Sequence, residues 1–146
     1  MADYKRGAHT VHDIKLHVVW TTKYRYPILT GEIGLAARDR IRRICLERDA
    51  TIVQGSVKSD HVHLLVEIPP DLSVSDLMQA VKGKSSRFLF QDFPTLRRRY
   101  WGQHLWARGY FAASVGQVDE ALIKEYIAHQ DKPREEGFTV DDAHGL

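Results

Sequence analysis

The sequence predicts an α+β fold: a ferredoxin-like antiparallel sheet of βαββαβ order, with two helices on one face and a further C-terminal helix. Two observations predict it. Stretches in which apolar and polar residues alternate indicate strands, and longer stretches with apolar residues at helical spacing lie between them. The length of 146 residues is typical of one domain. We therefore expect a single domain over residues 1–146, with a core over about 10–133 and an acidic, loose tail over 134–146.

The individual elements have local signals. Thr30 is a candidate N-cap for the first helix, and Ser73 or Ser75 is one for the second. Pro94 breaks the chain after the second helix, and residues 97–102 predict a basic, aromatic loop. The predicted strands cover residues 11–22, 51–57, 61–68 and 105–114, and the predicted helices cover 30–48, 74–90 and 120–131.

The third predicted strand carries the first candidate site. Side chains two apart in a strand share a face, so one face is apolar and suits the core: Val62, Leu64, Val66 and Ile68. His61 and His63 lie on the other face, about 7 Å apart along the backbone, where their rings could converge on one divalent metal. The alternative is a half-exposed surface pair. In a ferredoxin-like sheet the first and third strands are the central pair, so His17 could join this face, which lies opposite the two helices.

The overall composition is that of a protein without membrane segments. Hydrophobic residues make up 43% of the chain and charged residues 27%, which is ordinary for a globular protein. The sequence has no apolar run of transmembrane length, and its first ten residues do not resemble a signal peptide. The single Cys45 excludes an internal disulfide and is expected to be a small core residue. These features predict a cytoplasmic protein.

Basic residues gather between Lys82 and Tyr110, where seven bases accompany one acid and several aromatic residues. Such a surface can bind nucleic acid, because cations contact phosphates and aromatic faces stack on unpaired bases. The alternative is a solvated basic face over an aromatic core. The candidate DNA-binding residues are Lys82, Lys84, Arg87, Arg97, Arg98, Arg99 and Arg108.

The last predicted helix carries a second candidate site. Tyr126 and Gln130 are four residues apart and therefore lie on one face of that helix. Phenolate is costly at neutral pH, by roughly 4 kcal/mol for a pKa near 10, and a metal ion that polarises a phosphate can offset such a cost. His61, His63 and Gln130 could supply three ligands to that metal. The alternative is an amphipathic helix in which Tyr126 packs on the core.

Five blocks of the sequence occur together in one family. They are Thr21–Arg25, the His-Val-His strand at 61–63, Gly83–Arg87, Leu96–Phe111 and Tyr126–Gln130. In this combination the chain resembles the HUH single-tyrosine transposases of the insertion sequence 200/605 kind, over about residues 10–133.

This resemblance implies a metal-dependent DNA-cleaving enzyme. His61 and His63 would be the paired metal ligands, Gln130 the third ligand, and Tyr126 the nucleophile that attacks a phosphodiester of single-stranded DNA. The expected product is a 5′-phosphotyrosine link with a free 3′-hydroxyl, which can be rejoined without ATP. Mg²⁺ or Mn²⁺ is the expected metal, although imidazole ligands also accept zinc or nickel.

The resemblance also implies a homodimer that recognises DNA hairpins near the ends of an insertion sequence. The C-terminal helix can be exchanged in such dimers, so that Tyr126 completes the partner's site. Gly116 precedes that helix and is the candidate hinge, with a simple turn glycine as the alternative. The basic segment from Lys82 to Tyr110 would contact hairpin phosphates and stacked bases.

Two other functions stay open at this point. A domesticated or inactive relic of the same fold would bind hairpins without cutting them, against which the intact His61, His63, Tyr126 and Gln130 argue. A metal-dependent nuclease would instead use water as its nucleophile, with His17 or Glu67 as an additional ligand.

Overall fold

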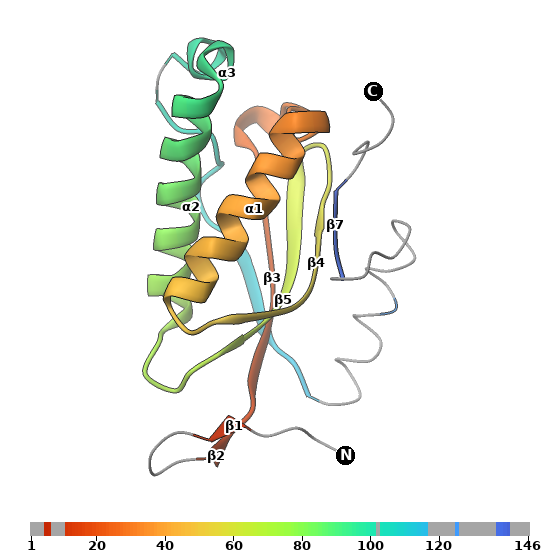
Figure 1. Cartoon of the computed structure of the whole chain (residues 1–146), viewed down its shortest axis with the longest axis vertical. Coiled ribbons are helices and arrows are strands. Elements are labelled where there is room, and N and C mark those ends of the chain that lie inside the picture. Colours follow the sequence, from red (N-terminus) through yellow and green to blue (C-terminus); the bar gives the residue numbers. More distant parts are fainter. Residues whose placement is uncertain (1–4, 7–10, 102, 117–124, 126–136, 141–146) are drawn as a thin grey trace.

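A five-stranded sheet carries two long helices on one of its faces in the computed structural model of the chain (Figure 1). The structure describes residues 5–6, 11–101, 103–116, 125 and 137–140. The strands are β1 (Lys5–Arg6), β2 (Val11–His12), β3 (Ile14–Thr21), β4 (Thr51–Val57), β5 (His61–Ile68), β6 (Phe111–Ser114) and β7 (Phe138–Val140). The helices are η1 (Lys23–Arg25), α1 (Gly31–Glu47), α2 (Val74–Asp92) and α3 (Pro94–Arg99).

The sheet has the strand order β6-β3-β5-β4-β7, and β1 and β2 form a separate small hairpin. The predicted first and third strands, β3 and β5, are the central pair, as expected, and they run antiparallel from Ile14 opposite Ile68 to Thr21 opposite His61. The α+β class is confirmed. The sheet is mixed rather than purely antiparallel, because β7 adds to β4 in parallel.

One face of the sheet is the core face. The apolar side chains predicted for this face on β5 are buried, and so are Leu16, Val18 and Trp20 of β3. They pack with α1 and α2 in a single cluster. In α1 it is Cys45 that faces this cluster, whereas Leu46 is exposed. Burial raises the pKa of the Cys45 thiol to about 12, with a smaller opposing effect from Arg48, so this cysteine is a core residue and not a nucleophile.

Most predicted boundaries are close to the observed ones. Ser73 is the N-cap of α2, since its hydroxyl oxygen accepts a hydrogen bond from the Asp76 amide at 3.0 Å. Thr30 is the N-cap residue of α1 but makes no side-chain capping bond there. None of the described helices is long and apolar enough to cross a membrane.

The last strand of the predicted fold begins later in the chain than expected. We expected it over residues 105–114, but β6 covers only Phe111–Ser114. Residues before it are held against α2 instead: the Trp106 indole N–H donates to Ser85 Oγ at 2.9 Å. Gly109 has a φ of +77°, which interrupts extended backbone just before β6.

The predicted basic loop over residues 97–102 was also wrong in part. Residues 97–99 belong to the short helix α3, which begins at Pro94. Proline at the first helical position has a suitable φ and lacks only an amide that would be unpaired anyway. The three arginines lie in the last turn of this helix, where positive charge is favourable.

The tail over residues 134–146 is not loose throughout. Phe138, Thr139 and Val140 form β7 and are each at most 6% exposed. Their parallel pairing with residues 55–57 of β4 extends the sheet at its edge (Figure 1). The predicted final helix over residues 120–131 lies outside the described residues, apart from Glu125, which is helical.

Two helix glycines provide a test of how β7 packs. A Cβ at Gly34 of α1 would lie 2.5 Å from Val140 Cγ1 and 2.8 Å from the Leu29 carbonyl oxygen, whereas a Cβ at Gly83 of α2 would meet nothing within 4 Å. We expect Gly34→Ala to lower the free energy of unfolding by about 1–3 kcal/mol. Gly83→Ala should raise it by about 0.5–1 kcal/mol, because alanine favours helix. Urea unfolding measures both; a neutral Gly34→Ala would contradict the docking of β7 against α1.

Candidate metal and DNA site

Two histidines of β5 lie side by side on the face of the sheet opposite the helices. The ring centroids of His61 and His63 are 4.8 Å apart, with an angle of 71° between the ring planes. Both residues are half-buried, whereas Leu65 and Glu67, further along the same face, are buried. The strand period places all four on one face because side chains alternate. The accessible part of this face is therefore the end that carries the two imidazoles.

His17 joins this face, which the sequence left open. It lies on β3, opposite Leu65 of β5. Its ring stacks on that of His63, with 5.8 Å between centroids and 12° between planes, and the ring of Phe111 meets it edge-on. Burial lowers the pKa of His17, so the neutral imidazole is favoured. Its Nε2 atom is buried and has no hydrogen-bond partner among the described residues.

A carboxylate orients His61. The Nδ1 atom of His61 lies 2.6 Å from Asp60 Oδ1, and Arg25 Nε donates to Asp60 Oδ2 at 3.0 Å. Partial burial raises the pKa of Asp60, but the hydrogen bonds and charges of His61 and Arg25 outweigh this, so the pKa lies below its usual value. An ionised carboxylate only accepts hydrogen bonds, so His61 Nδ1 is the donor and Nε2 is the nitrogen left to bind a ligand.

Tyr126 and Gln130 lie outside the described residues. Within the described part of the chain, no group of three or more His, Cys, Asp or Glu residues is arranged to hold a metal ion. Gly116, the candidate hinge, follows β6 and is exposed. Of the three predicted metal ligands, the described residues thus include His61 and His63.

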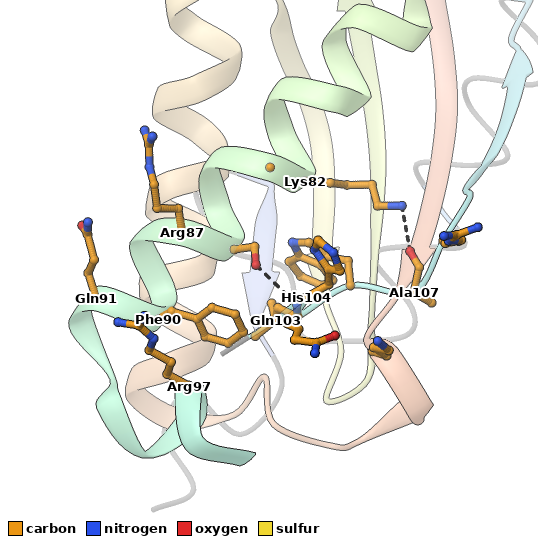
Figure 2. Close-up of a pocket in the computed structure, with 14 residues that line it drawn as sticks. Lys82, Arg87, Phe90, Gln91, Arg97, Gln103, His104 and Ala107 are labelled. Atoms are coloured by element: carbon orange, nitrogen blue, oxygen red, sulfur yellow. Dashed lines mark hydrogen bonds between the residues drawn. The ribbon is translucent and has the colours of Figure 1, made fainter. Parts of the chain in front are cut away.

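A basic cavity of about 1100 Å³ lies between α2, α3 and the segment before β6 (Figure 2). Four of the seven predicted DNA-binding residues line it: Lys82, Arg87, Arg97 and Arg108. Arg98 and Lys84 are not among the lining residues, and Arg99 lies over the ring of Tyr26 at 4.2 Å. The structure therefore brings basic residues from both ends of the Lys82–Tyr110 stretch to one cavity.

Sequence reasoning missed Lys23, Gln103 and His104, which also line the cavity. Lys23 comes from the turn after β3, and its amide donates to the Leu105 carbonyl oxygen at 2.8 Å. No local pattern predicts a contact between residues so far apart in the chain. The aromatic residues in and next to the basic stretch divide between core and surface: Phe90, Tyr100 and Trp106 are buried, and Trp101, Tyr110 and Phe111 are exposed.

Lys82 lines the cavity, and its ammonium group also binds backbone of the segment before β6. Its Nζ atom donates to the carbonyl oxygens of Ala107 and Gly109, each at 2.8 Å; Figure 2 shows the first of these bonds. Burial lowers the pKa of Lys82. Two of its three protons thus hold the segment before β6 against α2, and this role was not predicted.

The fold and site together define an α+β domain with a histidine pair on the face of its sheet opposite the helices and a basic cavity beside the helices. The sequence matches the family described as "Transposase IS200 like" over residues 10–130. The chain belongs to this family of IS200-like transposases.

Individual relatives agree with this assignment. The chain is 39% identical to the transposase for insertion sequence element IS200 of Salmonella typhimurium over 130 residues, covering 89% of this chain and 85% of that protein. It is 33% identical to the ISDra2 transposase TnpA of Deinococcus radiodurans over 128 residues, covering 88% and 91%.

Two solved structures resemble the fold. One is a chain from Deinococcus radiodurans R1 described as a transposase, with a TM-score of 0.72 and 34% identity, covering 86% of this chain and 97% of that one. The other is a REP-associated tyrosine transposase bound to a REP hairpin, with a TM-score of 0.60 and 13% identity, covering 88% and 72%. The second comparison shows the fold alone.

The role of Lys82 can be tested by hydrogen exchange. Lys82→Met removes both hydrogen bonds to the 107–109 backbone while keeping a side chain of similar length. Bonds to a charged donor are worth about 1.5–3 kcal/mol, so we expect amide exchange over residues 105–111 to become at least tenfold faster. Lys84→Met, two residues further along α2, is the control. Equal exchange in both variants would show that Lys82 does not hold this segment.

Proposed function

We propose that this protein cleaves and rejoins single-stranded DNA at the ends of an insertion sequence, through a covalent link to Tyr126. The observation that carries the proposal is the half-buried histidine pair on the face of the sheet opposite the helices, with His61 oriented by Asp60. Membership in the IS200-like family supports the transposase activity. The basic cavity beside α2 supports a nucleic acid as the substrate.

The donor set fits a divalent metal ion. His61 and His63 would bind it through imidazole nitrogens, and Gln130 would add an amide oxygen. The contact between Asp60 and His61 is the arrangement that orients metal-binding histidines, because it holds the tautomer and the orientation of the ring. When bound, Mg²⁺ or Mn²⁺ would polarise the scissile phosphate and neutralise charge that develops there.

The protein's own groups would perform the transfer. The Tyr126 oxygen loses its proton and forms a bond to phosphorus, and the bond from phosphorus to the 3′-oxygen breaks. The leaving oxygen takes up a proton and becomes a free 3′-hydroxyl. Because the phosphodiester is replaced by a phosphotyrosine ester, attack by another 3′-hydroxyl can reverse the step without ATP.

Substrate recognition and assembly complete the proposal. The cations that line the cavity would contact phosphates of a DNA hairpin at the end of the element, with Arg87, Arg97 and Arg108 as the candidates, since Lys82 already donates two hydrogen bonds to backbone. The protein would act as a homodimer. The segment after Gly116 would then allow Tyr126 to serve the site of its own subunit or of the partner.

The covalent intermediate is the direct test of this function. The purified protein is incubated with single-stranded oligonucleotides that tile the DNA on both sides of its gene, with Mg²⁺ or Mn²⁺. We expect a 3′-labelled oligonucleotide to remain attached to the protein on a denaturing gel, and a 5′-labelled one to be released as a shorter strand with a free 3′-hydroxyl. Tyr126→Phe should abolish both products, since phenylalanine has no nucleophilic oxygen.

Each rival function has its own signature in this assay. Strand cleavage that survives Tyr126→Phe, with no attached strand, would indicate a nuclease that uses water. Retained hairpin binding without any cleavage by the unaltered protein would indicate a binding relic. Tyr110→Phe is the matched control, because it removes an exposed phenol outside the proposed catalytic set.

A further inference from the structure

The turn η1, between β3 and α1, has an unusual backbone. Tyr24 and Arg25 have φ values of +63° and +54°, so two consecutive residues other than glycine are left-handed. This conformation costs about 1–3 kcal/mol for each such residue, and it persists only where the surroundings enforce it. Strain of this kind is concentrated at functional sites, so the position of these two side chains requires an explanation.

The surroundings hold the turn from both sides. On one side the amide of Thr22 donates to the Asp60 carbonyl oxygen at 2.9 Å, and the Thr22 hydroxyl donates to the Tyr26 carbonyl oxygen at 2.8 Å. On the other side the amide of Lys23 donates to the carbonyl oxygen of Leu105, in the segment that lines the basic cavity. The turn is therefore attached both to the histidine strand and to the cavity.

The three residues of the turn have three different environments. The Lys23 side chain lines the basic cavity, and Arg25 bonds to Asp60, which in turn contacts His61. Tyr24 lies between them in the chain and is 67% exposed. The aromatic ring of Tyr26 is 5.4 Å from that of Tyr24, and the Lys23 ammonium is 5.3 Å from the centroid of the Tyr24 ring. The strained backbone thus presents to solvent an aromatic ring that contacts the ring of Tyr26 and the Lys23 ammonium.

We infer that Tyr24 is a stacking platform for one unpaired base of the single strand that runs between the basic cavity and the histidine pair. An exposed aromatic ring can stack on any base, and the Lys23 ammonium beside it suits a phosphate of the same strand. This inference rests on the proposed function, because it assumes that the substrate is single-stranded DNA. It adds a specific residue, outside the metal site and the cavity, that would fix the path of the strand.

The same residues argue against a purely structural role. A tyrosine that served the core would be buried, as Tyr100 is at 4% exposure. Trp101 is more exposed and also has positive φ, but among the described contacts nothing connects it to the histidine strand. The 23–25 turn, together with Thr22 before it, contacts both the cavity segment and the strand connection that carries Asp60.

The test is binding of a sequence-independent single strand. Fluorescence anisotropy with labelled dT20, in EDTA to prevent cleavage, gives the Kd of each variant. Loss of one stacked base corresponds to about 1–3 kcal/mol, so Tyr24→Ala should raise the Kd by about fivefold to a hundredfold. Tyr24→Phe should bind within about twofold of the unaltered protein because it keeps the ring. Leu46→Ala, at a residue of α1 that is similarly exposed at 64%, should have no effect.

Salt dependence separates stacking from charge. Tyr24→Ala should leave the slope of log K against log salt unchanged, whereas Lys23→Ala should make it shallower by about 0.7 for one lost phosphate contact. Urea unfolding of each variant checks that the protein stays folded.

Unchanged affinity in Tyr24→Ala, equal losses in Tyr24→Phe and Tyr24→Ala, or no binding of dT20 by the unaltered protein would overturn the inference. The covalent-link assay is independent of this one. If the unaltered protein forms the Tyr126 adduct while the Tyr24→Ala variant binds dT20 with unchanged affinity, only the stacking role of Tyr24 is refuted.

Discussion

The register between β3 and β5 is the constraint on which the site depends. Thr21 lies opposite His61, and Val19 lies opposite His63. A slip of one residue would turn every side chain of β5 to the other face, placing His61 and His63 in the apolar core and Val62 and its neighbours in water. The buried apolar face of β5 therefore fixes the position of the two imidazoles. Stability of the core and placement of the site have the same cause.

The connections around that sheet link the histidine pair to a basic cavity. The turn after β3 reaches Asp60 through Arg25, and it reaches the cavity through Lys23. Lys82 of α2 holds the segment that closes the cavity and leads into β6. That strand places Phe111 against His17, which stacks on His63. A small number of hydrogen bonds thus couples the site to the surface on which we propose that DNA lies.

Sequence patterns predicted the features that depend on neighbouring residues, namely the faces of a strand and the order of the elements. The alternation in residues 61–68 was enough to separate core from site, and the sequence of elements predicted β3 and β5 as central neighbours. Contacts between distant residues were not predictable in this way. The bond between Arg25 and Asp60, and those from Lys82 to Ala107 and Gly109, join side chains and backbone more than 20 residues apart. The sequence around a lysine or arginine does not show whether its side chain contacts DNA or a backbone carbonyl oxygen, as the case of Lys82 illustrates.

Short elements were the other source of error. β7 has three residues within an acidic segment, so its apolar character was too brief to outweigh the surrounding charge. Residues 97–99 carry a charge pattern suited to the end of a helix, but three adjacent arginines after a proline also suit a loop. The predicted pairing of Tyr126 with Gln130 stays a prediction, since both lie outside the described residues.

The most direct test of the proposed metal site is anomalous diffraction from a crystal soaked in manganese, because it requires no DNA sequence. We predict one Mn²⁺ peak coordinated by His61 and His63, with Gln130 within ligand distance and Tyr126 of either subunit facing the ion. The His61→Ala protein should lose the peak under the same soak. A manganese peak bound elsewhere, with Tyr126 packed among apolar side chains, would contradict a nicking and joining site built on the histidine pair.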